Sequence, residues 1–192
     1  MKKLMSILIA VLVVFTITSC GDNNANGNDE QSGENLKIEK SAKEESKDVI
    51  LEKKQVVKVE DKYEFNVDFS QITKKVMPPK PAEYYHYYDA DEGKEYVDLC
   101  IAYKNLSTDV VMADDALSGK IQYAGKYDYN GFSIIEEKNR GSFTYSNITE
   151  IAPLTEEYVH LLFEIPEEAA TSTEPIVASI VVGENTYKYN IR

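Results

Sequence analysis

Four stretches of this chain alternate apolar and polar residues, which is the pattern of a β-strand with one face in a core and the other in water. A period of two does not fit an amphipathic helix, so this feature restricts the fold most strongly. The apolar faces consist of Tyr63, Phe65, Val67 and Phe69; Val97, Leu99, Ile101 and Tyr103; Val159, Leu161, Phe163 and Ile165; and Tyr187, Tyr189 and Ile191. We expect each stretch to be a half-buried strand.

Further strands are expected at residues 118–124, 127–135 and 176–182, which are bounded by turn-forming glycines and prolines. Residues 183–185, Gly-Glu-Asn, form a short loop that suits a hairpin. About seven short strands without a long amphipathic helix predict one all-β domain at residues 61–192, an immunoglobulin-like antiparallel β-sandwich. A closed barrel is the alternative, because the pattern does not show how the sheets end.

The first residues have the three parts of a secretory signal peptide. Lys2 and Lys3 precede an apolar run from Leu4 to about Ile17, and small polar residues lead to Cys20. The run is shorter than the roughly 20 residues that span a bilayer, and no basic cluster follows it. We therefore expect residues 1–19 to be removed on export, and a retained transmembrane helix is the weaker alternative.

The end of this signal, Ile17-Thr18-Ser19-Cys20, resembles the bacterial lipobox. The resemblance implies cleavage before Cys20 and attachment of a diacylglyceryl group to its thiol. Two acyl chains hold a protein stably at a membrane, whereas one chain binds only marginally. We expect a lipid-anchored protein on the extracytoplasmic face of the cell membrane. The alternative is an ordinary secretory signal followed by a chance cysteine.

Residues 20–60 are expected to form the lipidated cysteine and a disordered polar tether. The stretch is rich in Asn, Asp, Glu, Lys, Gly and Ser, and it has no aromatic residue. Such a composition buries too little apolar surface to offset the entropy lost on ordering. Within it, residues 48–51 could form a helical turn, and Val57 and Val59 could begin the first strand early.

The charge of the chain excludes one class of partner. The formal net charge is −12, and it becomes −14 once residues 1–19 are removed, because they contain two lysines and no acid. Arg140 and Arg192 are the only arginines. Such a chain does not gather the cationic surface that nucleic acids require, so we expect no nucleic-acid partner. A basic protein partner remains compatible with this charge.

The inventory of reactive side chains predicts neither an enzyme nor a cofactor. Once Cys20 is lipidated, Cys100 is the last thiol, and it lies in a strand-like run where a packing role is expected. His86 and His160 with one thiol are too few for a His/Cys zinc site. His160 falls on the polar side of its strand, and no motif marks a nucleophile for either histidine. We expect no catalytic residues, no metal and no cofactor.

Residues 84–88, Tyr-Tyr-His-Tyr-Tyr, form the most unusual local sequence. Tyrosine offers a large amphipathic contact area at a low entropic cost, so Tyr84, Tyr85, Tyr87 and Tyr88 are candidate binding residues. If the segment is a strand, alternation places about half of these side chains in the core.

Two segments carry a resemblance to a known family. They are residues 95–107, which end in Lys104-Asn105-Leu106-Ser107, and Pro153 followed by residues 160–166, which end in Phe163-Glu164-Ile165-Pro166. These segments resemble the telokin-like, immunoglobulin-fold domains of unknown function in lipoproteins of Gram-positive bacteria. The chain departs from the pattern where Leu154 follows Pro153 in place of the usual glycine. The resemblance implies a fold and a location, and no chemistry.

Three functions fit these features. The first is a membrane-anchored binding or interaction module that presents a sandwich face or loop to a protein or cell-wall component. The second is an accessory or structural subunit of a cell-envelope complex. The third is a solute-binding lipoprotein of a transporter, which is disfavoured because such proteins usually need two lobes around a cleft.

Overall fold

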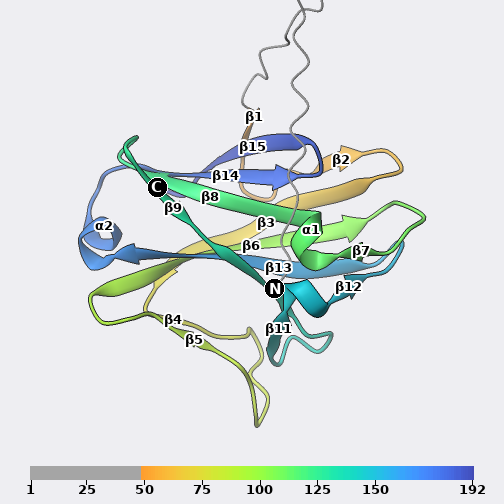
Figure 1. The fold of residues 1–192 in the computed structure, drawn as a ribbon, viewed down its shortest axis with the longest axis horizontal. Helices are drawn as coiled ribbons and strands as arrows, with labels where there is room; N and C mark the ends of the chain where they lie inside the picture. Colours follow the sequence, from red (N-terminus) through yellow and green to blue (C-terminus); the bar gives the residue numbers. More distant parts are fainter. Residues whose placement is uncertain (1–48) are drawn as a thin grey trace, which may run out of the picture. The chain divides into compact units, whose positions relative to one another are not determined.

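The computed structural model describes residues 49–192, which form a β-sandwich (Figure 1). One sheet has five strands, in the order β1 (Val49–Leu51), β15 (Asn185–Asn190), β14 (Ile176–Val182), β8 (Leu117–Tyr123) and β9 (Tyr127–Asn130). The other sheet has six, in the order β11 (Phe143–Tyr145), β10 (Phe132–Glu136), β13 (Glu156–Pro166), β6 (Lys94–Asn105), β3 (Tyr63–Thr73) and β2 (Val57–Val59). The predicted sandwich is confirmed, and the two separate sheets exclude the closed barrel.

The remaining elements are short. They are the pair β4 (Lys75–Val76) and β5 (Tyr88–Asp89), the pair β7 (Val111–Met112) and β12 (Glu150–Ile151), the helices α1 (Ala113–Ala116) and α2 (Glu167–Thr171), and the 3-10 helix η1 (Ser146–Ile148). The strand total therefore exceeds the expected seven or so. No helix within residues 49–192 is long and apolar enough to cross a membrane.

The core between the sheets follows from the alternation in the sequence. Val159 and Phe163 of β13 are buried together with the inward residues of β6 and of the facing sheet. Phe65 of β3 packs edge-on against Tyr187 of β15, with their ring centroids 5.1 Å apart. Each large apolar side chain that is fully buried in this way contributes roughly 1.5–3 kcal/mol. This burial holds the two sheets together.

Asn105 explains why β6 ends where it does. Its side-chain amide donates to the carbonyls of Asp109, at 2.7 Å, and Ile151, at 3.0 Å, and its Oδ1 accepts from the backbone N–H of Ser107. A buried amide with all these partners fixes the loop that follows the strand.

A β-bulge corrects one predicted strand face. The pairing of β3 with β6 shifts register between Val67 and Phe69. A bulge inserts one residue, so the side chains that follow it change faces. Val67 remains in the core between the sheets, whereas the ring of Phe69 packs against His160 on the other side of the six-stranded sheet. The prediction that Phe69 shares a face with Tyr63 and Phe65 was wrong.

The predicted strand at residues 127–135 is two strands in different sheets. The chain leaves β9 at Asn130, passes through Gly131 and continues as β10 in the six-stranded sheet. A Cβ atom on Gly131 would lie 2.4 Å from the carbonyl oxygen of Leu162 and 2.5 Å from Cδ1 of Phe163. Only glycine lets the backbone cross so close to β13.

The β-sandwich includes residues that precede residue 61. Residues 49–51 pair in parallel with β15, and residues 57–59 pair with β3. Leu51 is buried in the main core, so the end of the expected tether contributes to the sandwich. The helical turn expected at residues 48–51 was wrong, whereas Val57 and Val59 do form a strand ahead of β3. Cys20 and the rest of the expected tether, residues 20–48, lie outside the described residues.

A second, smaller core covers the outer face of the six-stranded sheet. It consists of Val76, Tyr96, Ile134, Phe143 and Leu162, with Tyr88 and Ala90 packed against it. Figure 1 shows the pair β4 and β5 on this side, beyond the six-stranded sheet, whose edge strand β11 contributes Phe143. These segments bury side chains that the strand pattern alone assigns to water.

Candidate functional site: an exposed tyrosine loop beside a buried charge cluster

Residues 83–87 form an exposed loop, which we call the tyrosine loop. Tyr84 is 86% exposed and Tyr87 is 47% exposed, while Tyr85 is half-buried. The fourth candidate, Tyr88, belongs to β5, and its ring lies 5.5 Å from that of Phe132 and 6.2 Å from that of Phe143. The condition under which about half of these tyrosines would be core residues is not met, because only Tyr88 lies in a strand, and none of the four is fully buried.

The tyrosine loop and the residues before it are held along the segment that joins β10 to β11. The backbone N–H of Ala82 donates to the carbonyl of Gly141 at 3.0 Å. The backbone N–H of His86 donates to Oγ of Ser142 at 3.1 Å, and its Nδ1 donates to the carbonyl of Phe143 at 3.1 Å. These bonds fix the backbone and leave the rings of Tyr84 and Tyr87 outside.

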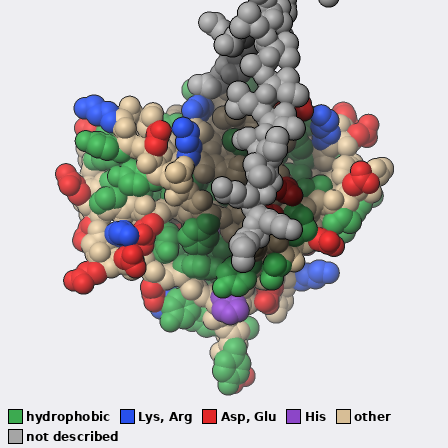
Figure 2. All heavy atoms as spheres, viewed as in Figure 1, with side chains coloured by type: hydrophobic (Ala, Val, Ile, Leu, Met, Phe, Trp, Pro, Cys, Tyr) green, Lys and Arg blue, Asp and Glu red, His purple; other side chains and the backbone are tan. Residues whose placement is uncertain are grey.

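Two open hollows adjoin the tyrosine loop. The larger, of about 490 Å³, is lined by Glu83, Tyr84, Tyr85, His86, Tyr87, Glu137 and Ser142. The smaller, of about 160 Å³, also includes Tyr87 and Glu137. Figure 2 shows hydrophobic side chains around an exposed histidine at the end of the domain where β4 and β5 lie. Aromatic rings and carboxylates therefore meet on one surface.

A cation already lies on this surface. The ammonium nitrogen of Lys75 lies over the ring of Tyr87, 4.0 Å from its centroid. An ammonium group over an aromatic face is attracted by the electron density of the ring. The arrangement shows that the ring of Tyr87 is oriented to receive a positive charge from the side of β4.

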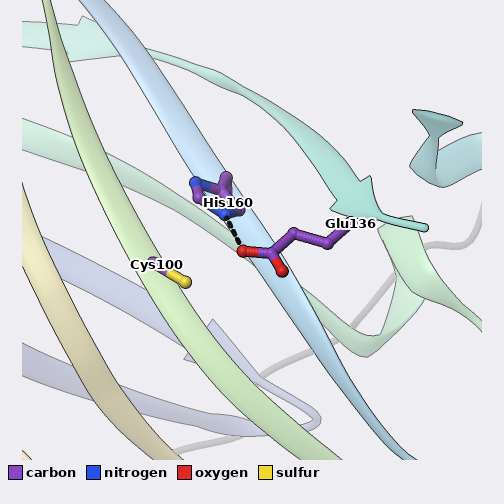
Figure 3. A group of neighbouring side chains, drawn as sticks. All are labelled: Cys100, Glu136 and His160. Carbon is purple, nitrogen blue, oxygen red and sulfur yellow. Dashed lines mark hydrogen bonds and ion pairs between the residues drawn. The ribbon is translucent and has the colours of Figure 1, made fainter. Parts of the chain in front are cut away.

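A cluster of charged side chains lies buried near the tyrosine loop, on the outer face of the six-stranded sheet. Its centre is His160 of β13, which is 1% exposed. Nδ1 of His160 lies 2.7 Å from Oδ1 of Asp98 on β6, and Nε2 lies 3.0 Å from Oε1 of Glu136 on β10. Cys100 of β6 is the cross-strand partner of His160. Figure 3 shows its sulfur beside the His160–Glu136 bond.

Further partners enclose the cluster. The guanidinium of Arg140 makes a two-point ion pair with Glu136 and lies 4.0 Å from the ring centroid of Tyr158. Gln71 donates to Oδ2 of Asp98 at 2.9 Å. The rings of Phe69 and Phe143 pack edge-on against the imidazole. Every buried polar side-chain atom of residues 49–192 has a hydrogen-bond partner.

The contacts set the protonation states of the cluster. Burial by itself would lower the pKa of His160, but its hydrogen bonds, first to Asp98 and also to Glu136, raise that pKa well above its usual value. Burial by itself would raise the pKa of Glu136, and the bonds from His160 and Arg140 lower it instead. Burial raises the pKa of Cys100, which keeps this group a thiol. Two carboxylates therefore face two cations.

The tyrosine loop and the charge cluster share supporting residues. Phe143 packs against the ring of His160 at 5.1 Å between centroids, and its carbonyl accepts from His86 in the loop. Arg140 pairs with Glu136, and its carbonyl accepts from the backbone N–H of Lys80 at 3.1 Å. The cluster thus underlies the segment on which the tyrosine loop is held.

The sequence pattern assigned His160 and Cys100 to the correct strands, but it did not predict that the two side chains lie next to each other in a buried cluster. His160 does lie on the face opposite the main core, as predicted, yet the second core, which includes Val76 of β4 and Phe143 of β11, covers that face. Cys100 is a buried residue, as expected, although one neighbour is a charged histidine. One signal was present: Asp98 interrupts an otherwise apolar run from Tyr96 to Tyr103. A carboxylate at the centre of the longest strand needs a buried partner.

Comparison with known proteins identifies the family of the chain. No family profile and no curated protein matches it. A crystal structure of an uncharacterized β-sandwich protein from Clostridium difficile 630 is 30% identical, with a TM-score of 0.71 over 78% of this chain and 98% of the other. The chain belongs to the family of this clostridial protein. The family has the β-sandwich fold, and its clostridial member has no described activity.

Two more distant crystal structures resemble the chain. A conserved hypothetical protein from Bacillus anthracis is 16% identical, with a TM-score of 0.48 over 72% of this chain and 92% of the other. A predicted lipoprotein of Bacillus subtilis, YcdA, is 11% identical, with a TM-score of 0.39 over 69% of this chain and 38% of the other. Neither likeness is close enough to carry a functional argument.

Proposed function

We propose that this protein is an extracytoplasmic lipoprotein, anchored to the cell membrane through Cys20, whose β-sandwich is a binding module. The tyrosine loop recognises a segment of a protein partner that presents lysine or arginine side chains. The observation that carries the proposal is the pairing of exposed tyrosine rings with carboxylates in one hollow, lined by Tyr84, Tyr87, Glu83 and Glu137.

The anchor is supported by the sequence. A basic start, an apolar run too short to span a bilayer and the lipobox-like Ile17-Thr18-Ser19-Cys20 are the features of a bacterial lipoprotein signal. The sandwich, in which every strand pair of the two main sheets except β1–β15 is antiparallel, also supports the resemblance to the telokin-like, immunoglobulin-fold lipoprotein domains. Membrane attachment would place the tyrosine loop in the envelope, where its partner is a protein of that compartment.

The shape and rigidity of the tyrosine loop support recognition. Large exposed tyrosines lose little rotamer entropy on binding, and such rings dominate many protein interfaces. The loop backbone is already fixed by the bonds of Ala82 and His86 to the β10–β11 segment. A fixed backbone reduces the ordering cost of association. The loop is therefore preorganised for contact.

Charge favours a basic partner over an acidic one. Glu83 and Glu137 line the hollow, and the whole chain carries a formal charge of −12. The Lys75 ammonium over Tyr87 is an internal example of the contact that a partner's lysine would make with the other rings. Complementary charge speeds encounter and suppresses acidic partners.

The test is a binding titration of the full chain in detergent with a short, fluorescently labelled lysine-rich peptide. We expect saturable binding that weakens at high salt, because exposed charges are screened. The double substitution Tyr84→Ser with Tyr87→Ser should weaken binding at least about tenfold, a loss of about 1.4 kcal/mol. Glu137→Gln should weaken binding by a smaller factor.

The matched control is Tyr127→Ser, which removes a tyrosine that is 57% exposed on edge strand β9 of the other sheet. It should leave the affinity unchanged. A glutamate-rich peptide of the same length should not bind. Equal binding by the native chain and the double variant, or equal affinity for both peptides, would contradict recognition through the tyrosine loop.

A cell-wall glycan is the second candidate ligand, and one observation favours it. An open hollow of about 430 Å³ is lined by the exposed rings of Phe132 and Tyr145 together with Ser118, Ser133 and Asn147. Aromatic faces with hydroxyl and amide groups suit a sugar. A chito-oligosaccharide in the same titration separates the two: binding that is lost in Tyr145→Ser and kept in the tyrosine-loop variant would favour the glycan.

A further inference from the structure

Three side chains with metal-binding atoms converge in the buried cluster. They come from three adjacent strands: Cys100 from β6, His160 from β13 and Glu136 from β10. One ligand atom of each, the sulfur, a ring nitrogen and a carboxylate oxygen, lies within 4.8 Å of the others. Figure 3 shows the three groups directed toward a common point. Strand pairing fixes all three backbones, so the convergence does not depend on a loop.

We propose that Cys100, His160 and Glu136 form a binding site for a divalent metal ion of zinc type. Ligand atoms bound to one tetrahedral zinc ion, at bond lengths of about 2.0–2.3 Å, lie roughly 3.3–3.7 Å from one another. The 3.0 Å between Nε2 of His160 and Oε1 of Glu136 is slightly shorter than this range. Small side-chain rotations would admit the ion.

The choice of metal follows from the ligands. A thiolate and an imidazole favour borderline or soft ions, and a carboxylate is accepted by zinc as well. Calcium and magnesium prefer oxygen ligands alone, so a site with sulfur and nitrogen excludes them. Histidine and cysteine alone are too few for a zinc site in this sequence, but the fold adds Glu136 as the third ligand.

Asp98 provides the support that a metal-bound histidine requires. It accepts from Nδ1 of His160 at 2.7 Å, which directs Nε2 toward Glu136 and Cys100. Gln71 in turn donates to the second oxygen of Asp98. Histidines that bind zinc commonly donate their other N–H to a carboxylate in this way, because the bond fixes the tautomer and the ring orientation.

The charge of the cluster is the same with and without the ion. Without metal, the carboxylates of Asp98 and Glu136 face the cations of His160 and Arg140, and Cys100 is a neutral thiol. When the ion binds, the proton on Nε2 of His160 and the thiol proton of Cys100 leave to solvent. The sulfur and nitrogen lone pairs then form the metal bonds. The two protons that leave carry the same charge as the divalent ion that enters, so binding leaves no uncompensated charge in the interior.

Arg140 competes with the ion and borders its route of entry. Its guanidinium holds both oxygens of Glu136, and its side chain is 30% exposed while that of Glu136 is 1% exposed. An ion that approaches Glu136 from solvent passes Arg140, and the positive charge of Arg140 opposes the ion. Removing that charge should therefore strengthen metal binding.

The test is spectroscopic titration with Co²⁺, which replaces zinc and reports thiolate ligation by a charge-transfer band. The sample is the full chain in detergent with Cys20→Ser, so that Cys100 is the one remaining thiol. We expect one ion per chain, the thiolate band, and about two protons released per ion. Zn²⁺ should abolish the band by displacement. A saturating titration without the band would overturn the proposal.

Variants separate metal binding from a structural role. Cys100→Ser should remove the thiolate band in a folded chain, and persistence of the band would overturn the site. Asp98→Asn should weaken binding by about 10–100-fold, as loss of support to a histidine ligand does. Arg140→Ala should bind Co²⁺ about tenfold more tightly, since a nearby unit charge is worth about 1–4 kcal/mol.

The Arg140→Ala result keeps the test decisive if the Cys100 variant does not fold. The side chain of Arg140 is 30% exposed, so its removal disturbs the packing of the cluster less than removal of the fully buried Cys100 does. Weaker or unchanged Co²⁺ binding in Arg140→Ala would contradict an ion that competes with this cation at Glu136. Tyr127→Ser, on edge strand β9 of the other sheet, is the matched control and should bind the ion as the parent chain does. The inference does not depend on recognition by the tyrosine loop.

Discussion

Nδ1 of His160 lies 2.7 Å from Oδ1 of Asp98, and each of these side chains is 1% exposed. Two opposite charges are thus removed from water on neighbouring strands of the six-stranded sheet. Such a pair is costly to bury, and it persists only where further hydrogen bonds complete it. Glu136 and Gln71 supply those bonds, so the four side chains tie β3, β6, β13 and β10 together on one face.

The raised pKa of His160 predicts that stability falls as the pH rises. Because this pKa is higher in the folded chain than in the unfolded chain, the stabilisation is fully present below about pH 6.5. It is lost as the pH rises toward the folded pKa, at a slope of at most about 1.4 kcal/mol per pH unit. Urea unfolding between about pH 6 and about pH 9, with a chelator present, measures this slope.

The same cluster predicts a loss of stability in acid. The pKa of Glu136 lies below its usual value of 4.5 when the chain is folded. The stabilisation by Glu136 is therefore present above that value and lost as the pH falls through the folded pKa.

His160→Gln tests the fall of stability at higher pH. In this variant the free energy of unfolding should no longer decrease as the pH rises above about 6.5. If it kept the slope of the parent chain, another group would be responsible.

Substitution of Glu136 should lower the free energy of unfolding more than substitution of its neighbour Glu137 does. Glu136→Ala leaves the buried imidazolium of His160 with one carboxylate, and breaking a buried ion pair costs about 3–5 kcal/mol. Glu137→Ala is the matched control, because Glu137 is exposed, and its effect should stay within about 0.5 kcal/mol. Urea denaturation at neutral pH compares the two. Equal losses would mean that the network does not stabilise the fold.

Gly131→Ala should destabilise the crossing between the sheets. The added methyl group would meet backbone and ring atoms of β13 at 2.4–2.7 Å, and relief of such a clash typically costs about 1–3 kcal/mol. In Gly141→Ala the nearest atoms, at 3.1 Å and 3.2 Å, belong to the flexible side chain of Asn139, so its loss should be smaller. Thermal unfolding of both variants tests this order, and a larger loss at Gly141 would contradict it.

Cys20→Ser should abolish membrane attachment. The thiol of Cys20 is the expected site of the diacylglyceryl group, and a hydroxyl does not replace it in that reaction. In a Gram-positive host fed with a clickable fatty acid, the parent chain should carry the label and sediment with membranes. The variant should carry no label. A Cys100→Ser chain is the control and should stay labelled, whereas label on the Cys20 variant would place the lipid elsewhere.

The alternation of side chains was sufficient to predict the sandwich and most of its long strands. It determines which face of β6 and β13 meets the other sheet, as Leu99 and Leu161 show. The pattern failed where one residue changed the geometry. The bulge after Val67 turned Phe69 outward, and Gly131 sent one predicted strand into two sheets. The bulge depends on tertiary packing, so no local propensity reveals it. Gly131 was a local signal inside the predicted strand, but the sequence does not show that the chain changes sheets there.

The buried cluster could not be predicted, because its members are far apart in the sequence. Asp98, Glu136 and His160 meet only through the pairing of β6 with β13 and of β13 with β10. Their burial also depends on the segment from β4 to β5, which the sequence did not place over the sheet. The tyrosine loop was identified from composition alone, but its non-strand backbone follows from its bonds to the β10–β11 segment.

Recognition by the tyrosine loop is tested most directly by an NMR titration of the isotope-labelled full chain with the lysine-rich peptide. We expect the amide shifts to change chiefly at residues 83–87 and at Glu137, while those of strand β9 around Tyr127 stay unchanged. Shifts that cluster on another surface, or a spectrum that does not respond to saturating peptide, would contradict recognition by the tyrosine loop.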